Sequence, residues 1–177
     1  MLLLDQKLFF FIYNFSGKTK IIDFLIIFFG KYLLYFLILF LIFLILKSWQ
    51  KKENFKIKFY LFSLFLALFA RFGVASLIRF FYHRERPFLY FSLPHLISDN
   101  SFSFPSGHTI FLFTLATSLY FINKKLAYFL YIFSILIGLS RIAGGVHYPS
   151  DILGGAILGI AIGILGNFFF KKFIKKN

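Results

Sequence analysis

Three short segments hold most of the arginine and histidine side chains of the chain. They are residues 79–87, 105–108 and 140–151. Arginine supplies fixed planar donors for phosphoryl oxygens, while histidine and aspartate supply a nucleophile, an acid and an orienting group. These residue types together indicate a site for the chemistry of a phosphate group.

The first segment places Arg79 and Arg86 seven residues apart, immediately before Pro87. Seven residues are two helical turns, so the two guanidinium groups share a face if the helix continues that far. Pro87 then ends the helix. Two arginines on one face could hold a phosphate between them, although arginines at the end of an apolar run also extend to lipid headgroups without such a role.

The second segment places Ser106, Gly107 and His108 directly before an apolar run, after Pro105. Ser106 is a suitable N-cap, and a helix that starts here presents free N–H groups and the positive end of its dipole. Such a start can bind an anion, and Gly107 allows a phosphate oxygen to approach the backbone closely. His108 would lie beside that anion. The alternative is an ordinary helix start with an interfacial histidine.

The third segment contains Arg141 at the end of an apolar run, a Gly-Gly turn, and then His147 and Asp151. The last two are four residues apart, so a helix that starts near His147 would let the carboxylate reach the imidazole. The carboxylate would keep one ring nitrogen protonated while the other faces the site. That arrangement is typical of a histidine nucleophile. The alternative is that Asp151 only satisfies N–H groups at a helix start.

The composition points to an integral membrane protein. Of the 177 residues 60% are hydrophobic, 31 are phenylalanine, and the mean hydropathy is +0.84, which is too apolar for a soluble domain of this size. The net charge of +14 comes from lysines clustered at the ends of apolar runs, a pattern that argues against nucleic-acid binding. The absence of cysteine excludes disulfides and thiolate metal sites.

The elements that must position the three segments are membrane helices. We expect an all-α polytopic bundle that forms one domain over residues 1–177. A span needs about 20 apolar residues, and five segments qualify: 24–46, 57–81, 106–122, 126–143 and 150–170. The stretch 2–15 is interrupted by polar residues and too short to cross, so we expect an interfacial helix there. We expect no cleaved signal peptide and assign targeting to the first span.

The lysines orient the bundle. They concentrate in the connection after the first span, the connection after the third span, and the C-terminal tail, which five spans place on one side. Cytoplasmic loops carry the excess of positive charge, so we expect a multi-pass protein of the inner or plasma membrane with the three segments on its extracytoplasmic face. Lys7, Lys18 and Lys20 run against this assignment.

Taken jointly, the three segments resemble the type 2 phosphatidic acid phosphatase (PAP2) or lipid phosphatase superfamily. Its pattern is Lys-x6-Arg-Pro, then Pro-Ser-Gly-His, then Ser-Arg-x5-His-x3-Asp. The order and the spacings agree over about residues 70–160. The one departure is Arg79, where the family usually has lysine; the charge is retained while the geometry of that phosphate contact changes.

The resemblance implies a metal-independent phosphatase without a cofactor. By it, His147 attacks phosphorus to form a phosphohistidine, Asp151 orients His147, and His108 protonates the leaving oxygen. The phosphoryl oxygens would be held by five residues: Arg79, Arg86, Ser106, Gly107 and Arg141. No magnesium cluster is expected, because Glu85 and Asp99 lack partner carboxylates nearby in the sequence.

The expected substrate is a lipid phosphate in the bilayer. A small five-span chain with a minimal outer loop looks most like the undecaprenyl diphosphate phosphatases, while phosphatidylglycerophosphate, phosphatidic acid and lipid A phosphates stay open as substrates. The connection 88–104 either shapes headgroup choice or is a structural cover. The sequence gives no indication of the oligomeric state.

Two other classes of protein are alternatives to the enzyme. In a small lipid or anion transporter, arginines would line a path through the bundle, but the sequence offers only Arg71 toward its middle. A haem or metal protein using His108 and His147 would leave the arginines unexplained. Arg71 itself either pairs with Asp23 or extends the basic site.

Overall fold

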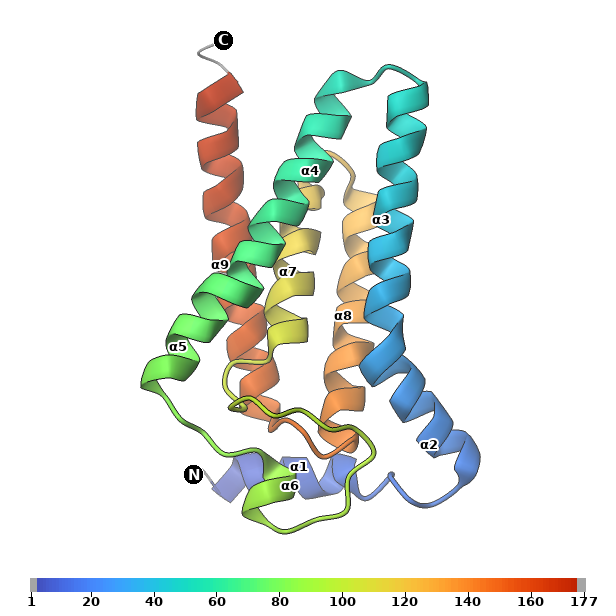
Figure 1. Ribbon diagram of the computed structural model, residues 1–177, viewed down its shortest axis with the longest axis vertical. Helices are drawn as coiled ribbons and strands as arrows, with labels where there is room; N and C mark the ends of the chain where they lie inside the picture. Colours follow the sequence, from blue (N-terminus) through green and yellow to red (C-terminus); the bar gives the residue numbers. More distant parts are fainter. Residues whose placement is uncertain (1–2, 175–177) are drawn as a thin grey trace.

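The computed structural model describes residues 3–174, and this part of the chain is helical throughout apart from its connections. The long helices run side by side as a bundle (Figure 1). The elements are α1 (Leu3–Tyr13), α2 (Lys20–Ile27), the π-helix η1 (Phe28–Tyr32), α3 (Leu33–Gln50), α4 (Asn54–Leu68), the π-helix η2 (Phe69–Val74), α5 (Ala75–Phe81), α6 (Pro87–Tyr90), α7 (Gly107–Tyr120), α8 (Lys124–Ala143) and α9 (Pro149–Ile174).

Four helical stretches within residues 3–174 are long and apolar enough to cross a membrane. Two of them are composite: α2, η1 and α3 run without a break over Lys20–Gln50, and α4, η2 and α5 over Asn54–Phe81. The others are α8 and α9. The predicted all-α membrane bundle is therefore confirmed, and each of these four predicted spans coincides with a helix.

The third predicted span, α7, has only 14 residues, which corresponds to about 21 Å at 1.5 Å per residue. It is the central helix: eleven of its residues are buried, and it packs against α4, α8 and, most extensively, α9. A helix surrounded by protein does not need the full hydrophobic length of one that faces lipid.

The contact between α7 and α9 depends on glycines on α9. A Cβ atom added to Gly159 would lie 2.8 Å from the carbonyl oxygen of Ile110, and one added to Gly163 would lie 2.6 Å from Cβ of Thr117. Real Cβ atoms almost never come that close. Small residues on one face let two membrane helices approach closely, and this approach brings the start of α7 next to the start of α9.

The outer surface of the bundle is apolar. Large hydrophobic side chains at least half exposed occur along its length, among them Phe36, Leu39, Phe43, Phe65, Phe72, Ile157, Ile164 and Phe168. A contiguous apolar surface of this kind is unfavourable in water and suited to lipid. The chain is a multi-pass membrane protein.

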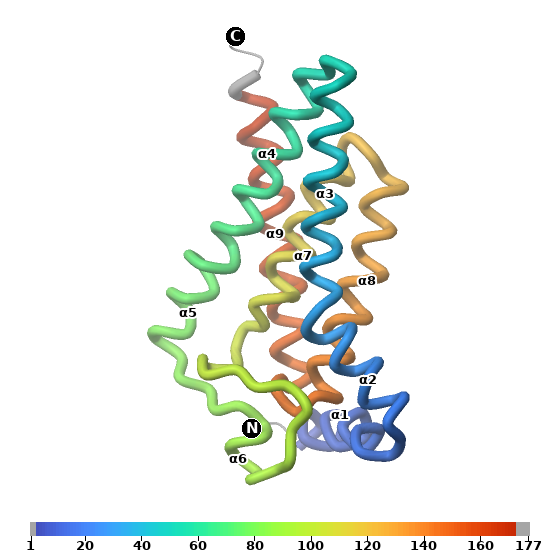
Figure 2. Tube along the Cα trace, turned by 45° about the vertical axis from the view of Figure 1, so that its right-hand side comes forward, coloured from blue at the N-terminus to red at the C-terminus, as the bar shows by residue number. Residues whose placement is uncertain are grey.

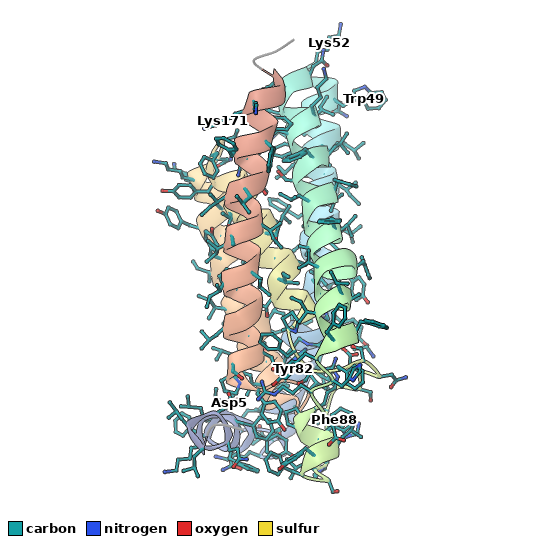
Figure 3. The ribbon with its side chains drawn as sticks, turned by 90° about the vertical axis from the view of Figure 1, so that its left-hand side faces the viewer. Asp5, Trp49, Lys52, Tyr82, Phe88 and Lys171 are labelled. Atoms are coloured by element: carbon teal, nitrogen blue, oxygen red, sulfur yellow. The ribbon has the colours of Figure 1, made fainter. Side chains whose placement is uncertain are left out.

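The two ends of the bundle differ in character. Lys52, Trp49 and Lys171 lie at one end, and Asp5 and Phe88 at the other (Figure 3). At this second end α1 lies across the bundle, beside α6 and the loop that leads to α7 (Figures 1 and 2). The predicted N-terminal helix therefore exists and does not span the bundle, and its Phe9 is fully buried.

Candidate active site

His147 and Asp151 form the centre of the site at the α1 end of the bundle. Nδ1 of His147 lies 3.4 Å from Oδ2 of Asp151. The helix begins at Pro149 rather than near His147, so the histidine lies in the turn before α9. Oδ2 also accepts the backbone N–H of Tyr148 at 2.8 Å. Asp151 therefore does both: it accepts a backbone N–H at the helix start and also approaches the imidazole.

Arg86 lies on the other side of the His147 ring. Its Nη1 is 3.3 Å from Nε2 of His147 and donates to the carbonyl oxygen of Val146 at 2.7 Å. A guanidinium group can only donate, so Nε2 is the acceptor and the proton of a neutral ring is assigned to Nδ1, which faces Asp151. The lone pair of Nε2 therefore points toward the cationic side of the site.

Electrostatics keep this imidazole neutral. Burial lowers the pKa of His147 well below its usual value, and the positive charges of Arg141 and Arg86 lower it further. The ring is almost completely buried, with 1% of its surface exposed. A neutral histidine with a lone pair on Nε2 is available as a nucleophile at neutral pH.

Arg79 and Arg86 do not share a helical face, and that prediction was wrong. The helix α5 ends at Phe81, and the backbone of Tyr82 is extended. The residue before a proline is disfavoured in helical geometry, which accounts for the extended Arg86. The two arginines still converge, because Nη1 of Arg79 donates to Oγ of Ser101 at 3.3 Å and Nη2 of Arg86 donates to the same oxygen at 3.0 Å.

Arg141 approaches the site from the end of α8. It is buried, and its Nη1 donates to the carbonyl oxygen of Gly30 in η1 at 3.2 Å. Its Nη2 forms an ion pair with Oδ2 of Asp99 at 2.9 Å. A carbonyl oxygen in the π-helical turn of the first span thus positions Arg141, the predicted phosphate ligand at the end of α8.

The start of α7 is where the sequence predicts it, with Ser106 in the N-cap position. The side chain of Ser106 accepts no helical N–H, so the first N–H groups of α7 keep no side-chain cap; its Oγ instead accepts from Oγ1 of Thr109 at 3.1 Å. Gly107 makes room for the arginines, since a Cβ atom there would lie 3.3 Å from Nη2 of Arg79. The same Nη2 donates to the carbonyl oxygen of Pro105 at 2.7 Å.

A cavity of about 120 Å³ is lined by three of the predicted site residues, Arg79, Gly107 and His108, and not by His147 or Asp151. Its lining includes His108, Gly107, Arg79, Arg71, Asp99 and Ser101. Arg71 therefore extends the basic site, whereas Asp23 accepts the backbone N–H of Gly17. A larger groove of about 520 Å³ shares Ser76, Arg79 and Ser101 with this cavity and opens to the surface.

Arg84 and Asp5 are components of the site that the sequence reading missed. Nη1 of Arg84 lies 2.6 Å from Oδ1 of Asp151, and its Nη2 pairs with Asp5. Asp5 also accepts from the backbone N–H and the hydroxyl of Ser150, at 2.9 and 2.7 Å. The only signal in the sequence was a lone carboxylate in an apolar N-terminal stretch. This network ties α1 to the carboxylate that faces His147.

Within residues 3–174, no three histidine, aspartate or glutamate side chains gather as metal ligands would. The carboxylates nearest to the site are instead paired with arginines: Asp99 with Arg86 and Arg141, and Asp151 with Arg84. The charges here suit an anionic ligand.

Fold and site together define an integral membrane helix bundle with a cluster of histidine and arginine side chains at one end. The chain belongs to the PAP2 superfamily, whose family model matches residues 56–175. The matched region includes all three sequence motifs, and the resemblance is thereby confirmed.

Three curated relatives carry phosphatase names, and another, of Bacillus licheniformis, is named bacitracin transport permease protein BcrC. The chain is 40% identical over 96 residues to undecaprenyl-diphosphatase BcrC of Bacillus subtilis, an alignment covering 54% of this chain and 48% of that protein. It is 35% identical over 88 residues to phosphatidylglycerophosphatase B of the same organism, covering 44% of this chain and 43% of the relative. The chain spans about half the length of the curated relatives it matches.

Two solved structures share the fold over nearly the whole chain. LpxE of Aquifex aeolicus superposes with a TM-score of 0.74 at 31% identity, covering 93% of this chain and 95% of LpxE. A PAP2 type phosphatidylglycerolphosphate phosphatase from Bacillus subtilis superposes with a TM-score of 0.73 at 22% identity, covering 97% and 88%. The second likeness concerns the fold alone.

Proposed function

We propose that this protein is a membrane lipid phosphatase that hydrolyses a lipid phosphate monoester or diphosphate. The observation that carries the proposal is the position of His147, with Asp151 at Nδ1 and Arg86 at Nε2. A neutral imidazole with an oriented lone pair, set among arginines, is suited to attack phosphorus. Membership of the PAP2 superfamily supports the same conclusion.

The proposed reaction proceeds in two steps. Nε2 of His147 attacks phosphorus, so that a P–N bond forms and the bond to the lipid oxygen breaks, while His108 gives a proton to the leaving oxygen. Water then gives a proton to His108 as it attacks the phosphohistidine, the P–N bond breaks, and phosphate leaves with both His147 and His108 restored. Asp151 holds the Nδ1 proton and stabilises the positive charge that the ring acquires.

The remaining site residues act through charge and position. We assign Arg79, Arg86 and Arg141 to the phosphoryl oxygens, together with the backbone at Ser106 and Gly107. Fixed donors aimed at developing charge are among the largest contributions to catalysis. Arg84 has a different task, because its ion pair with Asp151 fixes the carboxylate that orients His147.

For the substrate we propose undecaprenyl diphosphate. The supporting observation is that two curated relatives bear the name undecaprenyl-diphosphatase, one from Bacillus subtilis and one from Sulfolobus acidocaldarius. Phosphatidylglycerophosphate is the competing substrate, because another relative is named for it. Phosphatidic acid and lipid A phosphates are the remaining candidate substrates. We place the site on the extracytoplasmic face, opposite the lysine-bearing tips of α3 and α9.

The test is phosphate release by the detergent-purified chain in the presence of EDTA, with undecaprenyl diphosphate, phosphatidylglycerophosphate, phosphatidic acid and lipid A compared. His147→Ala is the blank, and His95→Ala, which alters an exposed histidine outside the cavity, is the matched control. We expect release that EDTA leaves intact, that is fastest with the diphosphate, and that His147→Ala abolishes. Absence of release from every lipid by folded protein would contradict the proposal and favour the transporter reading.

A further inference from the structure

The carboxylate of Asp99 lies between two of the arginines assigned to the phosphate. Its Oδ1 is 2.9 Å from Nη2 of Arg86, and its Oδ2 is 2.9 Å from Nη2 of Arg141. Each oxygen thus engages a different guanidinium group, and the carboxylate bridges them. Two such groups around one planar anion are the arrangement that arginines also form with phosphate.

The surroundings of Asp99 are strongly basic. Arg71, Arg79 and His108 line the same cavity. Burial raises the pKa of Asp99, but the charges of Arg86 and Arg141 lower it more, and the pKa lies below its ordinary value. The side chain is therefore an anion at neutral pH. Two hydrogen bonds from Ser101, to the same Oδ1, hold it in place.

The arginines would keep their positions if Asp99 moved away. Arg86 is held independently by the carbonyl oxygens of Val146 and Ser101, at 2.7 and 2.6 Å. Arg141 is held by Gly30. The donors that face Asp99 are thus the ones that an incoming anion can take over, while the rest of each guanidinium group stays anchored.

Asp99 itself can move without any helix moving. It belongs to the connection between α6 and α7, which follows an irregular path across the end of the bundle (Figure 2). Its side chain is 30% exposed, and the neighbouring Asn100 and Ser101 line the open groove. A side-chain rotation toward that groove would vacate the position between the arginines.

We propose that Asp99 is a specificity-determining residue, an internal anion that a substrate must displace from Arg86 and Arg141. This inference rests on the proposed function. The terminal phosphoryl group of a monoester or diphosphate carries a charge of about −1.5 to −2 at neutral pH, more than the single charge of a carboxylate. A phosphodiester, the linkage of ordinary bilayer lipids, carries only one charge and gains nothing by the exchange. Asp99 thereby excludes the abundant phosphodiesters from the site.

The test compares the intact chain with Asp99→Asn, which keeps the shape and removes the charge. Binding of inorganic phosphate is measured by calorimetry and by thermal stabilisation, and neither readout needs turnover. We expect Asp99→Asn to bind phosphate about tenfold more tightly. We also expect micelles containing phosphatidylglycerol, a phosphodiester, to compete with phosphate for this variant and not for the unchanged protein. Asp99→Glu, which restores the charge, should return toward the original behaviour.

The controls separate this inference from the function on which it rests. Asp23→Asn removes a carboxylate outside the cavity. It should change neither the affinity for inorganic phosphate nor the affinity for phosphatidylglycerol. If Asp99→Asn fails to fold, Asp99→Glu and Ser101→Ala, which loosens the carboxylate, provide the comparison, and the second should tighten phosphate binding. Unchanged or weaker phosphate binding by folded Asp99→Asn, or by Ser101→Ala where Asp99→Asn does not fold, would overturn the proposal. If Asp99→Asn bound inorganic phosphate more tightly but the unchanged protein released phosphate from no lipid, the displacement of Asp99 by an anion would be supported. The proposed phosphatase function would then be contradicted.

Discussion

Replacing Gly159 by alanine tests whether the packing of α9 on α7 sets the geometry of the site. The new Cβ atom would lie 2.8 Å from the carbonyl oxygen of Ile110 and 3.0 Å from the backbone nitrogen of Thr114. Ordinary contact begins at 3.4 Å, and 3.4 minus 2.8 gives 0.6 Å. Because the obstructing atoms are backbone atoms and Cβ of Phe113, none of which can rotate away, the helices themselves must separate by about that amount.

The separation has two expected consequences. Overpacking of a closely fitted interface costs about 1–3 kcal/mol, so the free energy of unfolding should fall by that amount. Ile110 is two residues from His108, so the shift also moves His108 relative to His147. A misplacement of 1 Å can reduce a rate about 100-fold, and for 0.6 Å we expect a loss of roughly tenfold in turnover.

The assay combines thermal unfolding in detergent with phosphate release from the preferred lipid. Gly166→Ala is the matched control on the same helix, because the atoms nearest to its new Cβ belong only to the side chain of Leu66, which can rotate away. We expect the control to retain most of its stability and activity. If Gly159→Ala were as stable and active as the unchanged protein, the inference that backbone contact fixes the site would be refuted.

Two further predictions concern charge. Arg84→Gln removes the ion pair with Asp151 and should lower kcat about tenfold with little change in KM, with partial rescue by Arg84→Lys; an unchanged kcat would show that Asp151 needs no such support. Stability should fall as the pH decreases below about 6.5, since burial and the nearby arginines depress the pKa of His147 in the folded state. Only the unfolded chain then binds the proton, a cost of up to about 1.4 kcal/mol per pH unit. The free energy of unfolding of the unchanged protein and of His147→Asn is measured by urea unfolding at several pH values. An equal pH dependence in the two proteins would show that His147 is not the cause.

The helices and the main site residues were predictable because their signals are local. Apolar runs of sufficient length mark the spans, and the spacing of His147 and Asp151 anticipated their proximity. Five spans place the second and the fourth connection on the same side of the membrane, so all three motifs were expected at one end of the bundle. The structure brings them together there.

The contacts that were missed join residues far apart in the sequence. Asp5 is 79 residues from Arg84 and 145 from Ser150, so no spacing rule connects them. The prediction that Arg79 and Arg86 share a helical face was wrong for another reason. It required α5 to continue to Pro87, whereas the helix ends at Phe81. The sequence placed Asp99 in a connection that either shapes headgroup choice or covers the site, and its pairing with arginines depends on the path of that irregular connection.

The π-helical turns η1 and η2 have a consequence for comparing this chain with its relatives. A π turn holds about one residue more than the α turn that it replaces. Deleting a single residue within Phe28–Tyr32 would restore regular winding and leave α2 facing the same way relative to α3, because the α turn completes the same rotation with one residue fewer. It would also remove the turn whose Gly30 carbonyl receives Arg141. Insertions and deletions of one residue, usually confined to loops, can therefore alter the site from inside a membrane span, and an alignment of this span must allow a gap within it.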